Sequence, residues 1–184
     1  MKVLENSFHI LDDLREILNE IDSGQIENVL TDILESNKIF VAAAGRSFLM
    51  MKAFAMRLMH MGFKVYVVGE SVTPAIQKGD LLLMGSGSGE TATLRVIAEK
   101  AKKAGATLDV LTIYKDSSIA GLSDRILVIP AATNQVEGGK TSWQPGGSSF
   151  EQSILILLDS MTISLAHELD ISLSGALNLH ANLE

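Results

Sequence analysis

Short apolar runs alternate with segments long enough to form a helix through most of this chain. The run from Ile39 to Ala44 is wholly apolar and is followed by Gly45, as expected for a strand buried on both faces of a parallel sheet. Similar, mainly apolar runs recur further along the chain, at Val65–Val68, Leu81–Met84, Leu108–Ile113 and Ile126–Ile129. Because the predicted strands alternate with helical segments, the sequence predicts an α/β fold with a mainly parallel sheet.

Length and composition favour one domain. Of the 184 residues, 47% are hydrophobic and 20% are charged, so the chain can bury one sizeable core, and we expect a single domain over residues 1–184. Apolar residues three and four positions apart predict two opening helices within about residues 1–36. A further helix is predicted from Phe150 to Leu169, which leaves a tail at about residues 170–184.

Charge and the N-terminal segment exclude several function classes. The net charge of −7 argues against a nucleic-acid partner, since affinity for nucleic acid comes from Lys and Arg that neutralise phosphates. Glu5, Asp12 and Asp13 interrupt the apolar residues at the N-terminus, so this segment predicts an amphipathic helix and not a secretory signal. No apolar stretch approaches the roughly 18 residues that a membrane helix needs, and we expect a cytoplasmic protein with no membrane partner.

The turn after Leu81–Met84 is rich in small and hydroxylated residues, and residues 85–93 read GSGSGETAT. In an open parallel sheet, ligands bind beyond the carboxyl ends of the strands, where loops lead into helix N-termini. Glycines let the backbone approach a ligand closely, free amides and the helix dipole attract an anion, and hydroxyl groups add neutral donors. The turn therefore predicts a phosphate site that uses the hydroxyls of Ser86, Ser88 and Thr91.

A purely structural interpretation of this turn is the alternative. Ser88 could cap the next helix, and Glu90 could lie in the first turn of that helix, where the dipole favours a carboxylate. The turn matches neither G-x-G-x-x-G nor G-x-x-x-x-G-K-[ST]. Gly139-Lys140-Thr141 comes near the second motif, but Asn134 replaces its first glycine. The turn therefore has no specific signature of a nucleotide-binding domain. A flavin- or nucleotide-binding domain of the same α/β class is a further alternative.

A second glycine turn, Ala44-Gly45-Arg46-Ser47, follows the first buried run. Ser47 could be a simple helix cap and Arg46 a solvated charge. Two strand ends that carry Gly and Ser, one of them with an arginine, nevertheless favour a small-anion pocket built from both turns. Lys140, in the long loop over residues 131–147, could reach a phosphate, and Glu90 could contact the hydroxyl groups of a sugar.

Several stretches of the chain resemble one enzyme family. They are AAGRS at 43–47, FAMRLMHMGF at 54–63, VGE at 68–70, GDLLLMGSGSGET at 79–91, QPGGSSFEQ at 144–152 and HANLE at 180–184. Together they resemble the 6-phospho-3-hexuloisomerases, which are sugar isomerase (SIS) domain proteins, along essentially the whole chain. The S-x-S-x-x-T turn marks the broad SIS group, which includes enzymes, regulators and binding modules, whereas FEQ together with the terminal HANLE is much more specific to the isomerase.

This chain departs from the family pattern at two places. Family members commonly have glycine where this chain has Ala43 and Phe48, next to the predicted pocket. They commonly read QPMGSLFEQ where this chain has Gly146 and Ser149. These departures concern the shape of the pocket and not the fold.

The resemblance implies a fold and an activity. The fold would be a three-layer, flavodoxin-like or Rossmann-like sandwich in which helices flank a five-stranded parallel sheet. The activity would be the interconversion of 3-hexulose 6-phosphate and fructose 6-phosphate through an enediolate, the second step of formaldehyde fixation by the ribulose monophosphate pathway. That step would couple the enzyme functionally to a hexulose-phosphate synthase. An isomerase of another phosphosugar and a non-catalytic sugar-phosphate-binding module are the alternatives.

The resemblance also implies roles for individual residues. The catalytic carboxylate proposed for the family falls on Glu151, which would remove a proton from C2 of the sugar. Without the resemblance, Glu151 would be interpreted as a helix N-terminal glutamate stabilised by the dipole. His180, in the tail, would assist ring opening or proton relay, in its own or in a neighbouring subunit. The predicted substrate-binding residues are Arg46, Ser47, Ser86, Gly87, Ser88, Gly89, Glu90 and Thr91.

No cofactor or metal is expected. Moving a carbonyl between neighbouring carbons needs no redox cofactor. The chain contains no cysteine, no H-E-x-x-H motif and no clustered histidines, which argues against a metal site. His60 and His167 lie in apolar helical segments and are predicted to be core or interface residues.

The segment from Phe48 to Met61 predicts self-association. Lys52, Arg57 and His60 are its only polar residues, so a helix there would be apolar nearly all round. A helix that covers one face of a sheet needs a single apolar stripe, and the second face is expected to be buried by another subunit. Because SIS proteins are commonly dimers or dimers of dimers, we predict a homo-oligomer, with a tetramer preferred over a dimer.

Overall fold

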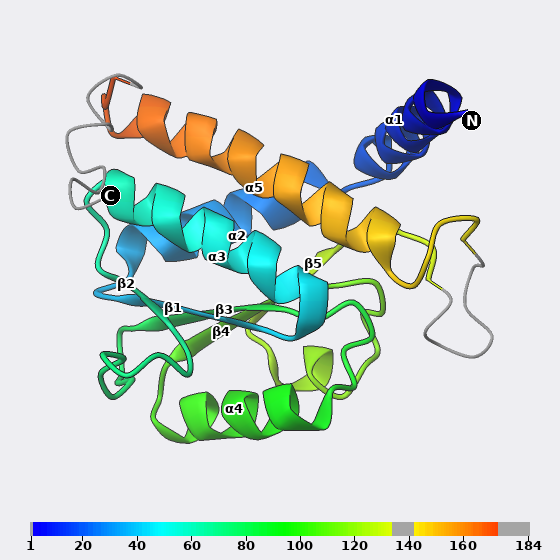
Figure 1. Ribbon diagram of the computed structural model, residues 1–184. Helices are drawn as coiled ribbons and strands as arrows, with labels where there is room; N and C mark the ends of the chain where they lie inside the picture. Colours follow the sequence, from blue (N-terminus) through cyan, green and yellow to red (C-terminus); the bar gives the residue numbers. More distant parts are fainter. Residues whose placement is uncertain (1, 134–141, 173–184) are drawn as a thin grey trace.

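The protein is built on a five-stranded parallel sheet with the strand order β2-β1-β3-β4-β5 (Figure 1). The computed structural model describes residues 2–133 and 142–172. Each predicted apolar run forms a strand, and the strand bounds differ from the predicted runs by about one residue. The strands are β1 (Ile39–Ala43), β2 (Val65–Val67), β3 (Leu81–Gly85), β4 (Thr107–Thr112) and β5 (Arg125–Val128).

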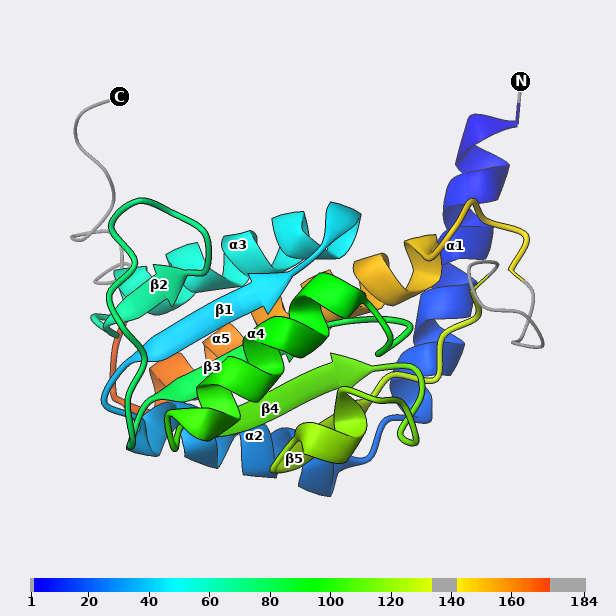
Figure 2. The same ribbon diagram turned by 90° about the horizontal axis from the view of Figure 1, so that it is seen from below.

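Helices cover the two faces of the sheet unequally. On one face, α2 (Ser23–Glu35) and α3 (Gly45–His60) lie against the strands, and α5 (Ser148–Glu168) packs on α3 (Figure 1). The other face is covered by α4 (Ala92–Lys103) and the short 3-10 helix η1 (Ala120–Leu122), both on the near side of the sheet in Figure 2. The predicted three-layer α/β fold is therefore confirmed.

Each face of the sheet has its own apolar core, because successive strand residues point to opposite faces. Val41 packs with Phe54 of α3 in the larger core, which α2, α3 and α5 share. Phe40 packs with Leu94 of α4 in the smaller core on the opposite face. Every residue of β1 and β3 is buried, which explains why these strands are apolar without alternation.

The helices begin earlier than their apolar patterns predict. Helix α3 starts at Gly45 and α5 at Ser148, whereas the apolar periodicity starts at Phe48 and Phe150. The residues of each helix that precede these two phenylalanines are small or polar, and they carry no periodic signal. The opening helix α1 (Val3–Asn19) contacts α5. Within residues 2–133 and 142–172, no helix is both long and apolar enough to cross a membrane.

The connections of β1 and β3 leave the sheet toward opposite faces. Helix α3 leads from β1 to β2 on one face, and α4 leads from β3 to β4 on the other. The two strands are neighbours, and their register pairs Ala43 with Gly85, so both end at the same level. Open parallel sheets bind ligands at such a switch point, where the diverging loops leave a crevice. The two glycine turns predicted to bind an anion therefore begin next to each other.

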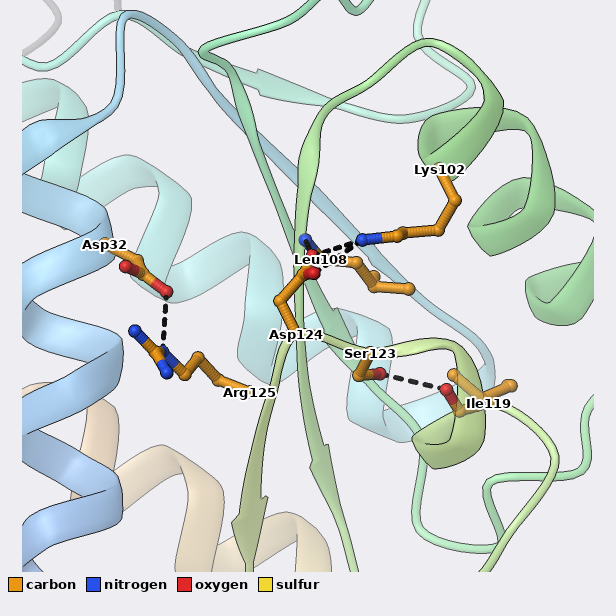
Figure 3. Close-up of polar contacts among 7 residues, drawn as sticks. All are labelled: Asp32, Lys102, Leu108, Ile119, Ser123, Asp124 and Arg125. Atoms are coloured by element: carbon orange, nitrogen blue, oxygen red, sulfur yellow. Dashed lines mark hydrogen bonds and ion pairs between the residues drawn. The ribbon is translucent and has the colours of Figure 1, made fainter.

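A pair of carboxyl groups is buried between the sheet and α2. Asp109 on β4 is fully buried, and within the described residues neither of its carboxylate oxygens meets a hydrogen-bond donor. Asp32 on α2 interacts with Asp109. Asp32 also forms an ion pair with Nε of Arg125, at 3.4 Å (Figure 3). Burial, and then the charge of Asp32, raise the pKa of Asp109 to about 8. Asp109 is therefore mostly protonated at pH 7 and can donate that proton to Asp32.

Because Asp109 is protonated in the folded protein, we predict that the free energy of unfolding falls as the pH rises. Between the ordinary Asp pKa of about 4 and the folded value of about 8, the folded protein keeps a proton that the unfolded chain releases. The free energy of unfolding should therefore fall with pH, by up to ~1.4 kcal/mol per pH unit. In Asp109→Asn this contribution is absent, so the variant should gain stability relative to the wild type from pH 5 to pH 8, as measured by urea unfolding.

Asp116→Asn is the matched control, because Asp116 is exposed. This variant should keep the pH dependence of the wild type. An Asp109→Asn protein whose free energy of unfolding follows the wild type at every pH would contradict the assigned protonation.

Candidate active site

The two glycine turns form one cleft at the carboxyl ends of β1 and β3. The cleft has a volume of about 220 Å³ and also includes the first turns of α4 and α5. Its lining consists of Ala44, Gly45, Arg46, Ser47, Gly85, Ser86, Gly87, Ser88, Thr91, Leu94 and Glu151. Most of the predicted substrate-binding residues and the predicted catalytic carboxylate thus lie around a single space.

Three helix N-termini meet at this cleft. The N-cap residues of α3, α4 and α5 are Ala44, Thr91 and Gly147, and none of them caps its helix with a side-chain hydrogen bond. The amide groups of the first turns are therefore not occupied by a capping side chain, and the positive ends of three helix dipoles lie nearby. Such an arrangement is suited to binding an anion, in a protein whose overall charge is negative.

The loop after β3 is held in a fixed shape. The amide of Ser86 donates to the carbonyl of Leu111 on β4, at 2.9 Å, and the amide of Gly89 donates to the carbonyl of Ser86, at 3.1 Å. Gly89 has a φ of +64°, and a Cβ at this position would lie 1.9 Å from Oγ of Ser117. Only glycine fits there, so the close approach of Ser117 determines the path of the loop that carries the hydroxyl groups.

The structural interpretation of this loop is wrong in two respects. Thr91, not Ser88, is the N-cap of α4, and the hydroxyl of Ser88 accepts a hydrogen bond from the amide of Glu90. Glu90 precedes the helix, and its carboxylate accepts hydrogen bonds from the hydroxyl and the amide of Ser118. These bonds lower the pKa of Glu90. Glu90 and Gly89, both predicted to bind substrate, are absent from the lining of the cleft, because Glu90 turns toward Ser118 and Gly89 shapes the loop.

Glu151 forms an ion pair across the cleft with Arg46. Glu151 lies in the first turn of α5, as predicted, and is only 8% exposed. Nη1 of Arg46 lies 2.9 Å from Oε2 of Glu151 and 3.0 Å from Oγ of Ser148. The sequence predicts Arg46 as a substrate-binding residue and does not indicate this ion pair. The one available signal was that each residue stands at the start of a helix that begins at the pocket.

Contacts of the two residues before Glu151 fix the start of α5. The ring of Phe150 is buried against Gly87, where an added Cβ would lie 3.2 Å from Cδ1 of the ring. The hydroxyl of Ser149 donates to the carbonyl of Ala132 at 2.9 Å. Phe150 thus joins the carboxylate-bearing helix directly to the hydroxyl-bearing loop.

The departures from the family pattern leave the cleft open. Phe48 is absent from the lining; it packs against the larger core, with Nζ of Lys52 4.8 Å from its ring centroid. Gly146 has a φ of +56° in the turn before α5, a conformation that glycine adopts without strain. Phe48 therefore does not obstruct the predicted binding space.

The remaining predicted residues fall into two groups. His180, Lys140 and the HANLE tail lie outside the described residues. His60 is buried in α3, as predicted, whereas His167 is exposed on α5, so its prediction as a core residue is wrong and an interface role stays a prediction. Among the described residues, no three His, Cys, Asp or Glu side chains are grouped so that they could hold a metal ion.

Comparison with known proteins identifies a family that the chain resembles. The family model described as SIS domain matches residues 32–150, which include both glycine turns. A 3-hexulose-6-phosphate isomerase of Bacillus subtilis is 41% identical over 185 residues, with 100% of both chains covered. A 3-hexulose-6-phosphate isomerase of Mycobacterium gastri is 39% identical and covers 99% of this chain and 92% of its own length.

A solved structure from Methanococcus jannaschii has the same fold along its full length. This protein is described as hypothetical, and a molecular function of 3-hexulose-6-phosphate isomerase is inferred for it from its structure. It superposes with a TM-score of 0.84 at 28% identity, with 100% of both chains covered. The family model matches more than half of the chain, and the relatives extend the likeness to both ends. The chain therefore belongs to the SIS-domain family.

Proposed function

We propose that this chain is a 3-hexulose-6-phosphate isomerase, which interconverts 3-hexulose 6-phosphate and fructose 6-phosphate. The observation that carries the proposal is the cleft at the switch point, where Glu151 lies beside hydroxyl groups and helix N-termini suited to a phosphate. The names of the full-length relatives support the same activity. The reaction would be the second step of the ribulose monophosphate pathway, and it would couple this enzyme functionally to a hexulose-phosphate synthase.

The phosphate group of the sugar would bind where the first turns of α3 and α4 meet. Ser47, Ser86, Ser88 and Thr91 line that part of the cleft and offer hydroxyl donors, and the amides of the helix first turns add further donors. A phosphate bound there would fix one end of the sugar. The reacting carbons would then extend toward the start of α5.

The chemistry requires a base and no oxidant. Removal of the proton on C2, which neighbours the C3 carbonyl, gives an enediolate. Return of a proton to C3 and transfer of the hydroxyl proton from the oxygen on C2 to the oxygen on C3 then complete the move of the carbonyl to C2. We assign the base role to Glu151, because its carboxylate lines the cleft from the start of α5 and is largely shielded from solvent.

Glu151→Gln tests the assigned base. Glutamine keeps the size of the side chain but cannot accept the C2 proton, so kcat should fall by roughly 10²-fold or more while the substrate still binds. The assay supplies 3-hexulose 6-phosphate, made in situ by a separate synthase from ribulose 5-phosphate and formaldehyde, and follows fructose 6-phosphate in the presence of a chelator.

The same assay separates the alternatives. A wild type that binds the sugar phosphate without converting it would be a binding module. A wild type that converts a different phosphosugar faster would be a related isomerase. Full turnover by Glu151→Gln would leave Glu151 as a helix N-terminal residue without a catalytic role.

Thr91→Val tests the phosphate site. Valine keeps the shape of threonine but removes one hydroxyl donor, and Thr91 makes no capping hydrogen bond that the change would break. Loss of one hydrogen bond to a charged group should raise KM about tenfold or more, with kcat little changed. Thr93→Val is the control, because Thr93 is exposed in the same helix turn and is absent from the lining. Equal KM values for the two variants would contradict the assigned site.

We propose that the chain acts in the cytoplasm as a single-domain homo-oligomer, preferably a tetramer. The supporting observation is an apolar stripe on α3, where Leu49 is 58%, Met56 45% and Met59 37% exposed. On the neighbouring α5, Ile156 and Ile163 are exposed as well. Burial of these side chains against another subunit would remove a substantial apolar area from water.

His180→Ala tests the predicted role of the tail. If His180 assists ring opening or proton relay, kcat should fall by about 10²-fold. Glu151→Gln and His180→Ala subunits, unfolded and refolded together, should regain activity if His180 serves the site of a neighbouring subunit, since a hybrid then contains an intact pair. No regain would place His180 in its own subunit's site. Unchanged turnover by His180→Ala would contradict any catalytic role.

A further inference from the structure

We propose that Arg46 is a positioning residue for Glu151 and not a ligand of the phosphate. Its guanidinium holds one oxygen of the Glu151 carboxylate so that the other oxygen is presented to the sugar. The inference rests on the proposed function, because it requires Glu151 to act as the base. It goes further by naming what holds the base in place.

The contacts of Arg46 are directed at the start of α5. One nitrogen, Nη1, lies within hydrogen-bond distance of both Oε2 of Glu151 and Oγ of Ser148. The hydroxyl of Ser148 in turn donates to the carbonyl of Pro145 at 2.7 Å. Arg46 therefore links the first turn of α3 to the first turn of α5 and to the loop before α5. Arg46 and Ser148 lie 102 residues apart in the sequence.

The hold on the carboxylate is one-sided. Arg46 binds Oε2 of Glu151, and among the described residues no hydrogen bond to Oε1 is formed. The side chain of Glu151 is 11% exposed, whereas that of Arg46 is 55% exposed. The ion pair therefore joins a nearly buried carboxylate to a guanidinium that is more than half exposed. A base must lie within hydrogen-bond reach of the proton that it abstracts, and a displacement of about 1 Å can cost about 10²-fold in rate.

Phosphate binding does not require Arg46. The cleft already offers the hydroxyls of Ser47, Ser86, Ser88 and Thr91 and the N-termini of α3 and α4. The charge of Arg46 is compensated by Glu151, and a phosphate that recruited the guanidinium would leave the nearly buried carboxylate without its partner. The geometry therefore separates a phosphate site that has no charged side chain from the Arg46–Glu151 ion pair, which serves the chemistry.

Steady-state kinetics of Arg46→Ala distinguishes the two roles. A positioning residue should lower kcat by about 10²-fold with KM changed less than about threefold, whereas a phosphate ligand should mainly raise KM. Arg46→Lys, which keeps the charge but not the geometry of the guanidinium, should recover part of kcat and guards against a folding defect in the alanine variant. Arg15→Ala is the matched control, because Arg15 is 73% exposed on α1 and should leave both constants unchanged.

A double-mutant cycle supplies the second readout. If Arg46 acts only through Glu151, the Arg46→Ala/Glu151→Gln protein should be no slower than Glu151→Gln alone, because no base remains to be positioned. Guanidinium ions, at concentrations too low to unfold the protein, should restore part of kcat to Arg46→Ala. They should restore nothing to Glu151→Gln. The exposure of Arg46 makes its place accessible to the added ion.

Several results would overturn the inference. A large rise in KM with kcat retained, or losses that multiply in the double variant, would make Arg46 a phosphate ligand while leaving the isomerase intact. Full turnover by Glu151→Gln would remove the base that Arg46 is proposed to position. An inactive wild type would overturn the proposed function itself, and with it this inference.

Discussion

The parallel pairing of β1 with β3 is the constraint on which the candidate site depends. The register places Ala43 beside Gly85 at the ends of the two strands, and the helices that follow depart to opposite faces of the sheet. A crevice forms at the ends of these strands, because the two connections diverge and neither fills the space between them. Both first turns border this crevice, so amides that lack an acceptor within their own helix gather in one place. Arg46 is the one positively charged residue among those that line the cleft in the described part of the chain.

The strands and the glycine turns could be predicted from local pattern because their causes are local. A strand buried on both faces must be apolar throughout, and this requirement is visible in β1 and β3. The start of α4 could not be predicted in the same way. It depends on the positive φ of Gly89, which is required by the approach of Ser117 from another loop. The sequence offers several hydroxylated residues before α4, and no local pattern identifies Thr91 as its N-cap residue.

One ion pair and one pair of carboxyl groups could not be predicted from the sequence, because in each case the two partners come from distant segments. Arg46 and Glu151 meet only after α5 packs on α3, and no periodicity relates their positions. Asp109 and Asp32 are likewise brought together by the packing of α2 on the sheet. A charged residue inside an otherwise apolar strand was a visible signal that Asp109 has an unusual environment, although the sequence could not identify its partner.

The glycine turns, which we propose to bind the phosphate, and the carboxylate of Glu151 are contributed by separate parts of the chain. The turns follow β1 and β3, whereas Glu151 lies on α5, the last described helix, where Phe150 packs against Gly87. Because of this division, the proposed phosphate site can keep its shape while the sequence of α5 changes. A fold of this kind can yield a different isomerase, or a receptor that only senses its ligand, through changes confined to one helix.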